Sequence, residues 1–115
     1  FSPDGRLLAS GYGRHRDDRS VVDHVRLRDV SSGRIEQEFE GHVNWVYSLA
    51  FSANGTRLAT GGWDGTVKTW DVASGRSLST LVGHEGIVMA VAFSPDGHTL
   101  ASTGYDQTVR CWDLD

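Results

Sequence analysis

Short apolar runs separated by polar, glycine-containing turns make up the hydrophobic pattern of this chain. Residues 46–51 are mostly apolar, and residues 66–71 combine β-branched and aromatic side chains with polar ones. Between these runs lie Asn-Gly and Asp-Gly pairs, which are typical of tight turns. Runs of this length, bounded by turn residues, predict β-strands. In the middle of the chain we expect four strands, over 46–51, 57–61, 66–71 and 76–82.

The same pattern repeats with a period of 42 residues. Three landmarks return at this spacing: a Gly-His pair, a Phe-Ser turn and a Trp-Asp pair. They lie at Gly41-His42 and Gly83-His84, at Phe51-Ser52 and Phe93-Ser94, and at Trp70-Asp71 and Trp112-Asp113. A period of this size predicts one supersecondary unit that recurs along the chain and packs against copies of itself.

The first copy of the unit follows the pattern less closely. Phe1-Ser2 matches the Phe-Ser turn, and Arg28 stands 42 residues before Trp70, so an arginine occupies the tryptophan position. Between these landmarks the first copy is eight residues longer than the middle one, and the extra length falls within 11–24. That segment is charged and lacks alternation, so we expect a solvated surface loop. The closing strand, 34–40, alternates apolar and polar residues, which is typical of a solvent-facing sheet edge.

The period, the opening Gly-His and the closing Trp-Asp resemble the WD-repeat family. The resemblance implies that each unit is a four-stranded blade of a β-propeller. We therefore predict an all-β chain, a partial β-propeller of about three four-stranded antiparallel blades. Blade 1 (partial) would span 1–40, blade 2 41–82 and blade 3 (partial) 83–115. We expect an excerpt of a larger propeller or multidomain protein; the alternative is self-assembly of several chains through uncovered blade faces.

Four polar positions recur with fixed spacing in the second and third copies. The sets are His42, Thr60, Asp64 and Trp70, and His84, Ser102, Asp106 and Trp112. In each, an indole N–H can donate to a hydroxyl, the hydroxyl to an imidazole nitrogen, and the other imidazole N–H to a carboxylate. The resemblance implies that these are structural hydrogen-bond tetrads. In the first copy Ser10 keeps the hydroxyl position, but Arg28 and Val22 replace the indole and the carboxylate, so we expect no relay there.

Two catalytic alternatives compete with this interpretation. Ser102, His84 and Asp106 also form a nucleophile, base and orienting acid, as a hydrolase would need. The recurrence of the set with Thr60, and the indole beside each hydroxyl, favour the structural role. A metal in the inserted segment is the other alternative; its candidate residues are Arg14, His15, Arg16, Asp17, Asp18, Arg19, Asp23 and His24. They lack cysteine and any fixed ligand spacing, so a surface or partner-contact loop is favoured. We expect no catalytic residue, cofactor or metal.

Composition and charge narrow the choice of function class. The chain has 38% hydrophobic and 23% charged residues and a formal net charge of −4. This acidic balance argues against a nucleic-acid binder, which usually carries a basic surface. No apolar run reaches the ~18 residues of a membrane span. The single cysteine, Cys111, we expect to be a small buried apolar residue. One thiol and no visible secretion signal lead us to expect a cytoplasmic protein.

Aromatic and sulfur-containing residues gather where the resemblance places one end of the propeller. The candidates for partner contact are Trp45, Tyr47 and Trp63 in the second copy, and Ile87, Met89 and Tyr105 in the third. Aromatic residues and methionine are enriched in the centres of protein interfaces. Tyr47 and Met89 could instead fill the space between blades. We therefore predict a non-catalytic scaffold that mediates protein–protein interaction and binds a protein or peptide.

Overall fold

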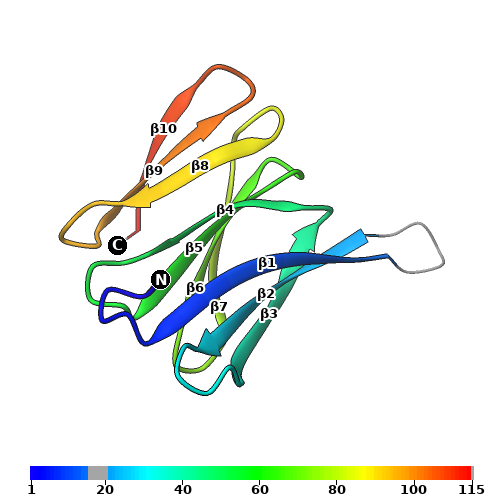
Figure 1. The fold of residues 1–115 in the computed structure, drawn as a ribbon. Coiled ribbons are helices and arrows are strands. Elements are labelled where there is room, and N and C mark those ends of the chain that lie inside the picture. Colours follow the sequence, from blue (N-terminus) through cyan, green and yellow to red (C-terminus); the bar gives the residue numbers. More distant parts are fainter. Residues whose placement is uncertain (16–20, 115) are drawn as a thin grey trace.

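The computed structural model of this chain describes residues 1–15 and 21–114, and they form three antiparallel sheets (Figure 1). The N-terminal sheet has the order β1 (Leu7–His15), β2 (Val21–Asp29) and β3 (Ile35–Val43). The central sheet contains β4 (Val46–Phe51), β5 (Arg57–Gly62), β6 (Thr66–Asp71) and β7 (Ser77–Val82). The C-terminal sheet contains β8 (Val88–Phe93), β9 (Thr99–Gly104) and β10 (Val109–Asp113). The prediction of an all-β chain built from partial propeller blades is confirmed.

A serine-based turn begins the second strand of the central sheet. The Ser52 hydroxyl accepts a 3.0 Å hydrogen bond from the Arg57 N–H and donates to the Asn54 side chain at 2.8 Å. Gly55 follows with a φ of 73°, a left-handed conformation that glycine adopts without steric cost. Equivalent serine turns begin β1 and β9. The Phe-Ser landmark of the sequence is therefore a rigid turn with its own hydrogen bonds.

Two hydrophobic layers hold the three sheets together. The layer between the N-terminal and central sheets contains the buried residues Leu7, Val25, Leu27, Phe39, Leu58 and Trp70. The layer between the central and C-terminal sheets contains Ala59, Val67, Val88, Val91 and Leu100. Since successive side chains along a strand point to opposite faces, β5 contributes Leu58 to one layer and Ala59 to the other. Each sheet therefore depends on its neighbour to bury its apolar face.

The inserted segment of the first copy is largely strand, which corrects our expectation of a surface loop. Pairing between β1 and β2 continues from Gly11 opposite Val25 to His15 opposite Val21. Figure 1 shows these two strands projecting beyond the rest of the N-terminal sheet. The backbone hydrogen bonds of a hairpin do not require apolar alternation, so a charged sequence can extend one. Of the candidate residues in the insertion, Arg16, Asp17, Asp18 and Arg19 lie outside the described residues.

Cys111 is exposed, and our expectation of a buried thiol is wrong. It lies on β10, where exposed and half-buried positions alternate and Trp112 takes an inward one. The hydrophobic layer beneath the C-terminal sheet contacts only that inward side, because Trp112 packs against it. Within the part of the chain that the structure describes, no helix has the length and apolarity that a membrane crossing requires.

Candidate functional site

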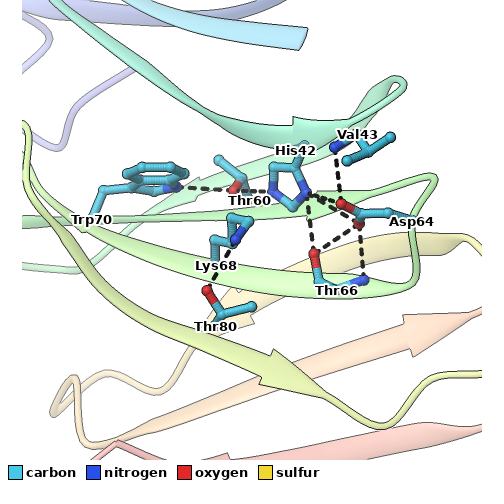
Figure 2. Close-up of polar contacts among 8 residues, drawn as sticks. All are labelled: His42, Val43, Thr60, Asp64, Thr66, Lys68, Trp70 and Thr80. Atoms are coloured by element: carbon cyan, nitrogen blue, oxygen red, sulfur yellow. Dashed lines mark hydrogen bonds and ion pairs between the residues drawn. The ribbon is translucent and has the colours of Figure 1, made fainter. Parts of the chain in front are cut away.

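The first four-residue set lies in a continuous relay of hydrogen bonds (Figure 2). The Trp70 indole N–H donates to the Thr60 hydroxyl oxygen over 3.0 Å, and that oxygen lies 2.6 Å from His42 Nε2. On the other side of the imidazole, His42 Nδ1 lies 3.2 Å from Asp64 Oδ1. A carboxylate oxygen can only accept, so Nδ1 carries the imidazole proton and Nε2 accepts the hydroxyl hydrogen. Each buried polar group of the set thus has a partner.

The relay joins two sheets. His42 lies on β3 of the N-terminal sheet, whereas Thr60 and Trp70 lie on β5 and β6 of the central sheet. Asp64 lies in the turn between β5 and β6, and its Oδ2 accepts the Val43 N–H over 3.0 Å. The carboxylate therefore fastens the segment that leads into the central sheet to the turn at the end of that sheet.

The second set repeats this geometry in the C-terminal sheet. The Trp112 indole N–H donates to the Ser102 hydroxyl over 2.8 Å, and the hydroxyl lies 2.7 Å from His84 Nε2. His84 Nδ1 lies 3.1 Å from both oxygens of Asp106. The Glu85 N–H donates to Asp106 Oδ2 over 2.9 Å, as the Val43 N–H does to Asp64. Exchange of threonine for serine leaves the arrangement unchanged.

The hydrogen bonds of both aspartates favour their ionised forms. Burial opposes ionisation of Asp64, but bonds from His42, Thr66 and the Val43 N–H outweigh it and lower the pKa of its carboxyl well below the usual value. The Glu85 N–H and the Thr108 hydroxyl are the main causes that lower the pKa of Asp106 in the same direction. Both carboxylates are therefore charged at neutral pH, which fixes them as acceptors.

Each relay has a fifth member that we did not predict. The Thr66 hydroxyl donates to Asp64 Oδ1 over 2.7 Å and lies 3.3 Å from His42 Nδ1. Thr108 makes the corresponding contacts with Asp106 and His84, at 2.7 and 3.2 Å. The signal that could have found these residues is in the sequence, because Thr66 and Thr108 are separated by the same 42-residue period.

The geometry does not suit nucleophilic catalysis at Ser102. Its side chain is almost completely buried, and its oxygen already accepts the Trp112 indole N–H. A substrate carbonyl would have to enter the packed space between two sheets to reach it. The same arrangement around Thr60 is equally buried. What both sets can do with this geometry is fix strands and turns relative to one another.

The first copy has a different arrangement at these positions. Arg28, at the tryptophan position, donates from Nη1 to the Gly33 carbonyl over 3.0 Å at the surface. Ser10 lies on β1, half-buried and paired with Arg26 of β2. On the face toward the central sheet, this sheet contributes Phe39, whose ring lies 5.4 Å from that of Trp70. Of Val22 the structure describes only the strand that contains it.

Three aromatic side chains meet at the end of the central sheet that carries Asp64. The Trp45 and Trp63 rings lie 5.5 Å apart and nearly perpendicular, and Tyr47 stacks on Trp63 at 6.2 Å. The exposed fractions of Trp45, Tyr47 and Trp63 are 47%, 42% and 42%. Trp45, Trp63 and Asn44 line a shallow hollow of about 170 Å³. We call Trp45, Tyr47 and Trp63 the aromatic patch.

The corresponding residues of the C-terminal sheet lie at the same end of their sheet. Within the part of the chain that the structure describes, their side chains form no such cluster of rings. The Tyr105 N–H donates to the Ile87 carbonyl over 2.8 Å, as the Trp63 N–H does to the Trp45 carbonyl. Tyr105 is among the most exposed large side chains, Met89 is exposed and Ile87 is half-buried. At Gly65 a Cβ would lie 3.0 Å from the Gly86 carbonyl oxygen, so the two sheet ends are in close contact.

Comparison with known proteins finds one family over most of the chain. The family model described as "WD domain, G-beta repeat" matches residues 33–71 and 75–113. Among curated relatives, the target of rapamycin complex subunit wat1 of Schizosaccharomyces pombe is 42% identical over 72 residues, covering 61% of this chain and 20% of that protein. Guanine nucleotide-binding protein subunit beta-5b of Danio rerio is 37% identical over 70 residues, covering 61% and 16%. Jouberin of Rattus norvegicus is 36% identical over 70 residues, covering 61% and 6%. The matched part of this chain thus spans a fifth or less of these relatives.

Proposed function

The chain belongs to the WD-repeat family, and on that premise we propose that it is a non-catalytic scaffold that binds a protein or peptide through its aromatic patch. Proteins of this family commonly bind other proteins and are generally non-catalytic. Relatives such as the rapamycin-complex subunit carry names that describe them as parts of complexes. Among the surfaces of the chain that the structure describes, the aromatic patch is the one best suited to bind a partner.

The observation that carries the proposal is the packing of three large aromatic side chains that stay close to half exposed. Trp63 contacts Trp45 edge to face and Tyr47 by stacking, so the three rings hold one another in place. Edge-to-face and offset-stacked rings contribute about 0.5–1.5 kcal/mol per pair beyond the area they bury. A clustered apolar surface that the chain itself leaves uncovered is typical of a protein contact. Tyr105 and Met89, in the neighbouring sheet, would extend the contact area.

Selection of peptides from a random library displayed on phage tests the proposal. Peptides enriched on the unaltered chain would be synthesised, and their affinities measured by fluorescence polarisation. Combined replacement Trp45→Ala and Trp63→Ala should weaken binding by about tenfold or more, since aromatic side chains that become buried on binding are typical hot spots. Leu78→Ala is the matched control, because Leu78 is 51% exposed on β7, away from the patch.

Two results would contradict the proposal. Enriched peptides that bind the double variant as tightly as the unaltered chain would remove the patch from the contact. A loss of the same size with Leu78→Ala would place binding on another surface. Far-UV circular dichroism of each variant separates loss of contact from loss of folding, because the three side chains changed here lie outside the buried core.

A further inference from the structure

A histidine and two glutamates meet on one face of the N-terminal sheet. His24 lies on β2 and is paired with Glu40 of β3, and Glu38 lies two residues before Glu40 on the same strand. Alternation along a strand places residues two apart on the same face, so both carboxylates are on the face of His24. His24 Nδ1 lies 3.2 Å from Glu38 Oε1 and 3.2 Å from Glu40 Oε1.

The spacing of these atoms matches the ligand set of a small divalent cation. One ligand atom from each of His24, Glu38 and Glu40 can be chosen so that all three lie within 4.8 Å of one another. Zinc bonds to imidazole nitrogen and carboxylate oxygen are ~2.0–2.2 Å long, so tetrahedral ligand atoms lie about 3.3–3.5 Å apart. The two nitrogen–oxygen distances are within about 0.3 Å of that value. A small movement of the exposed glutamates would bring the oxygens to it.

Burial and charge favour a cation at this position. The imidazole comes from a residue that is 4% exposed, so packing fixes its ring, whereas the Glu38 and Glu40 side chains are 36% and 64% exposed and leave a path for an ion. Two carboxylates and one neutral imidazole carry two negative charges, and the Arg26 guanidinium beside Glu38 offsets one of them, so the cluster stays attractive to a divalent cation. Arg26 Nε holds the other oxygen of Glu38, Oε2, at 3.2 Å, which orients that carboxylate and leaves Oε1 toward His24.

We propose that His24, Glu38 and Glu40 form a zinc-binding site on the outer part of the N-terminal sheet, with a fourth position open to water. Three protein ligands and one open position are typical of zinc sites that exchange a ligand. The residues of the inserted segment, which include His24, have no fixed ligand spacing among themselves. The glutamates that complete the set come from the next strand.

Isothermal titration calorimetry of the full chain with Zn²⁺ tests the site, because it gives both the stoichiometry and the affinity of binding. One equivalent of Zn²⁺ should bind, and Glu38→Gln and Glu40→Gln should each weaken binding by at least about tenfold, the loss typical even of an outer-shell partner. Glu36→Gln is the matched control, because it is an exposed glutamate on β3 outside the set. It should change the affinity less than twofold. The proposal would be overturned if the Glu38, Glu40 and Glu36 variants all bound Zn²⁺ with the same affinity, or if the unaltered chain did not bind Zn²⁺.

Titration with Co²⁺ gives a second readout that does not depend on the variants. Co²⁺ bound in place of Zn²⁺ by three protein ligands and a water should develop the intense visible absorption of a four-coordinate ion. Saturating Co²⁺ that leaves the weak spectrum of the hydrated ion would show that the three side chains do not enclose a metal. Zn²⁺ added afterwards should abolish the absorption, since both ions would compete for the same ligands.

Discussion

Replacement of Thr60 by valine is the most direct test of the central relay. The Thr60 hydroxyl is fully buried and serves two partners, the Trp70 indole N–H at 3.0 Å and His42 Nε2 at 2.6 Å. Valine has nearly the same shape, so Thr60→Val removes the hydroxyl without opening a cavity. It leaves a donor and an acceptor buried with no partner.

The magnitude follows from those two atoms. A buried polar group left unsatisfied costs about 1–3 kcal/mol, so the two together cost about 2–6 kcal/mol. The methyl group that replaces the hydroxyl offsets about 1 kcal/mol of this through its burial. A net loss of roughly 1–5 kcal/mol is a considerable part of the ~5–15 kcal/mol that stabilises a typical domain. Thr60→Ser, which keeps the hydroxyl as Ser102 does, should lose only about 1 kcal/mol.

Urea unfolding followed by far-UV circular dichroism measures these differences. Thr80→Val is the matched control, because Thr80 is exposed on β7 and its hydroxyl accepts a 2.9 Å bond from Lys68 that water can replace (Figure 2). Its effect should stay within about 0.5 kcal/mol. The reasoning is refuted if Thr60→Val costs no more than Thr80→Val at an unchanged dependence on urea concentration.

Three further predictions concern the relays. Ser102→Ala should destabilise the chain by at least about 1–3 kcal/mol in urea unfolding, because His84 and Trp112 each lose a buried hydrogen-bond partner. Ser102→Thr keeps the hydroxyl and should be tolerated, and an alanine variant as stable as the unaltered chain would contradict the relay. Folding lowers the pKa of Asp64, so its carboxylate stabilises the fold fully at a pH above its pKa of about 4 in the unfolded chain, and this contribution is lost as the pH falls further. Asp64→Asn should therefore reduce the slope of stability against pH below pH 4, and an unchanged slope would show that ionised Asp64 does not stabilise the fold. Gly62→Ala should lower the free energy of unfolding by about 1–3 kcal/mol, because the added Cβ would collide with His42 Nδ1 and lie 2.9 Å from Asp64 Oδ1. Gly11→Ala should lower it less in the same assay, because its Cβ would lie 3.3 Å from Val46 Cβ.

The strands of the central sheet could be predicted closely because their limits are local. The range expected for the third strand, 66–71, equals β6, and β5 extends one residue beyond 57–61. These strands end where a turn has its own stabilising bonds, as at Ser52 and Asn54, or where glycine takes a positive φ, as at Gly65. Such signals depend on neighbouring residues, so they can be read without knowledge of the fold.

The features that escaped prediction depend on contacts between distant segments. The extension of β1 and β2 rests on backbone pairing across the hairpin, which the charged side chains of the insertion do not reveal. Exposure of Cys111 depends on which face of β10 the hydrophobic layer reaches. The cluster of His24 with Glu38 and Glu40 requires the register between β2 and β3, which has a shift between residues 23 and 24. None of these is encoded by composition or by the 42-residue period.

The bond from Asp64 to the Val43 N–H has a consequence for the residues on either side of it. Asp64 follows Trp63 directly, and Val43 stands two residues before Trp45, so this one hydrogen bond fixes the backbone beneath both indoles. Because this backbone is ordered before any partner arrives, association would lose little main-chain entropy, and affinity would depend mainly on the side chains themselves. Substitutions at 45 and 63 could then redirect specificity while leaving the sheet beneath them unaltered, which makes the two positions suitable for engineering new recognition.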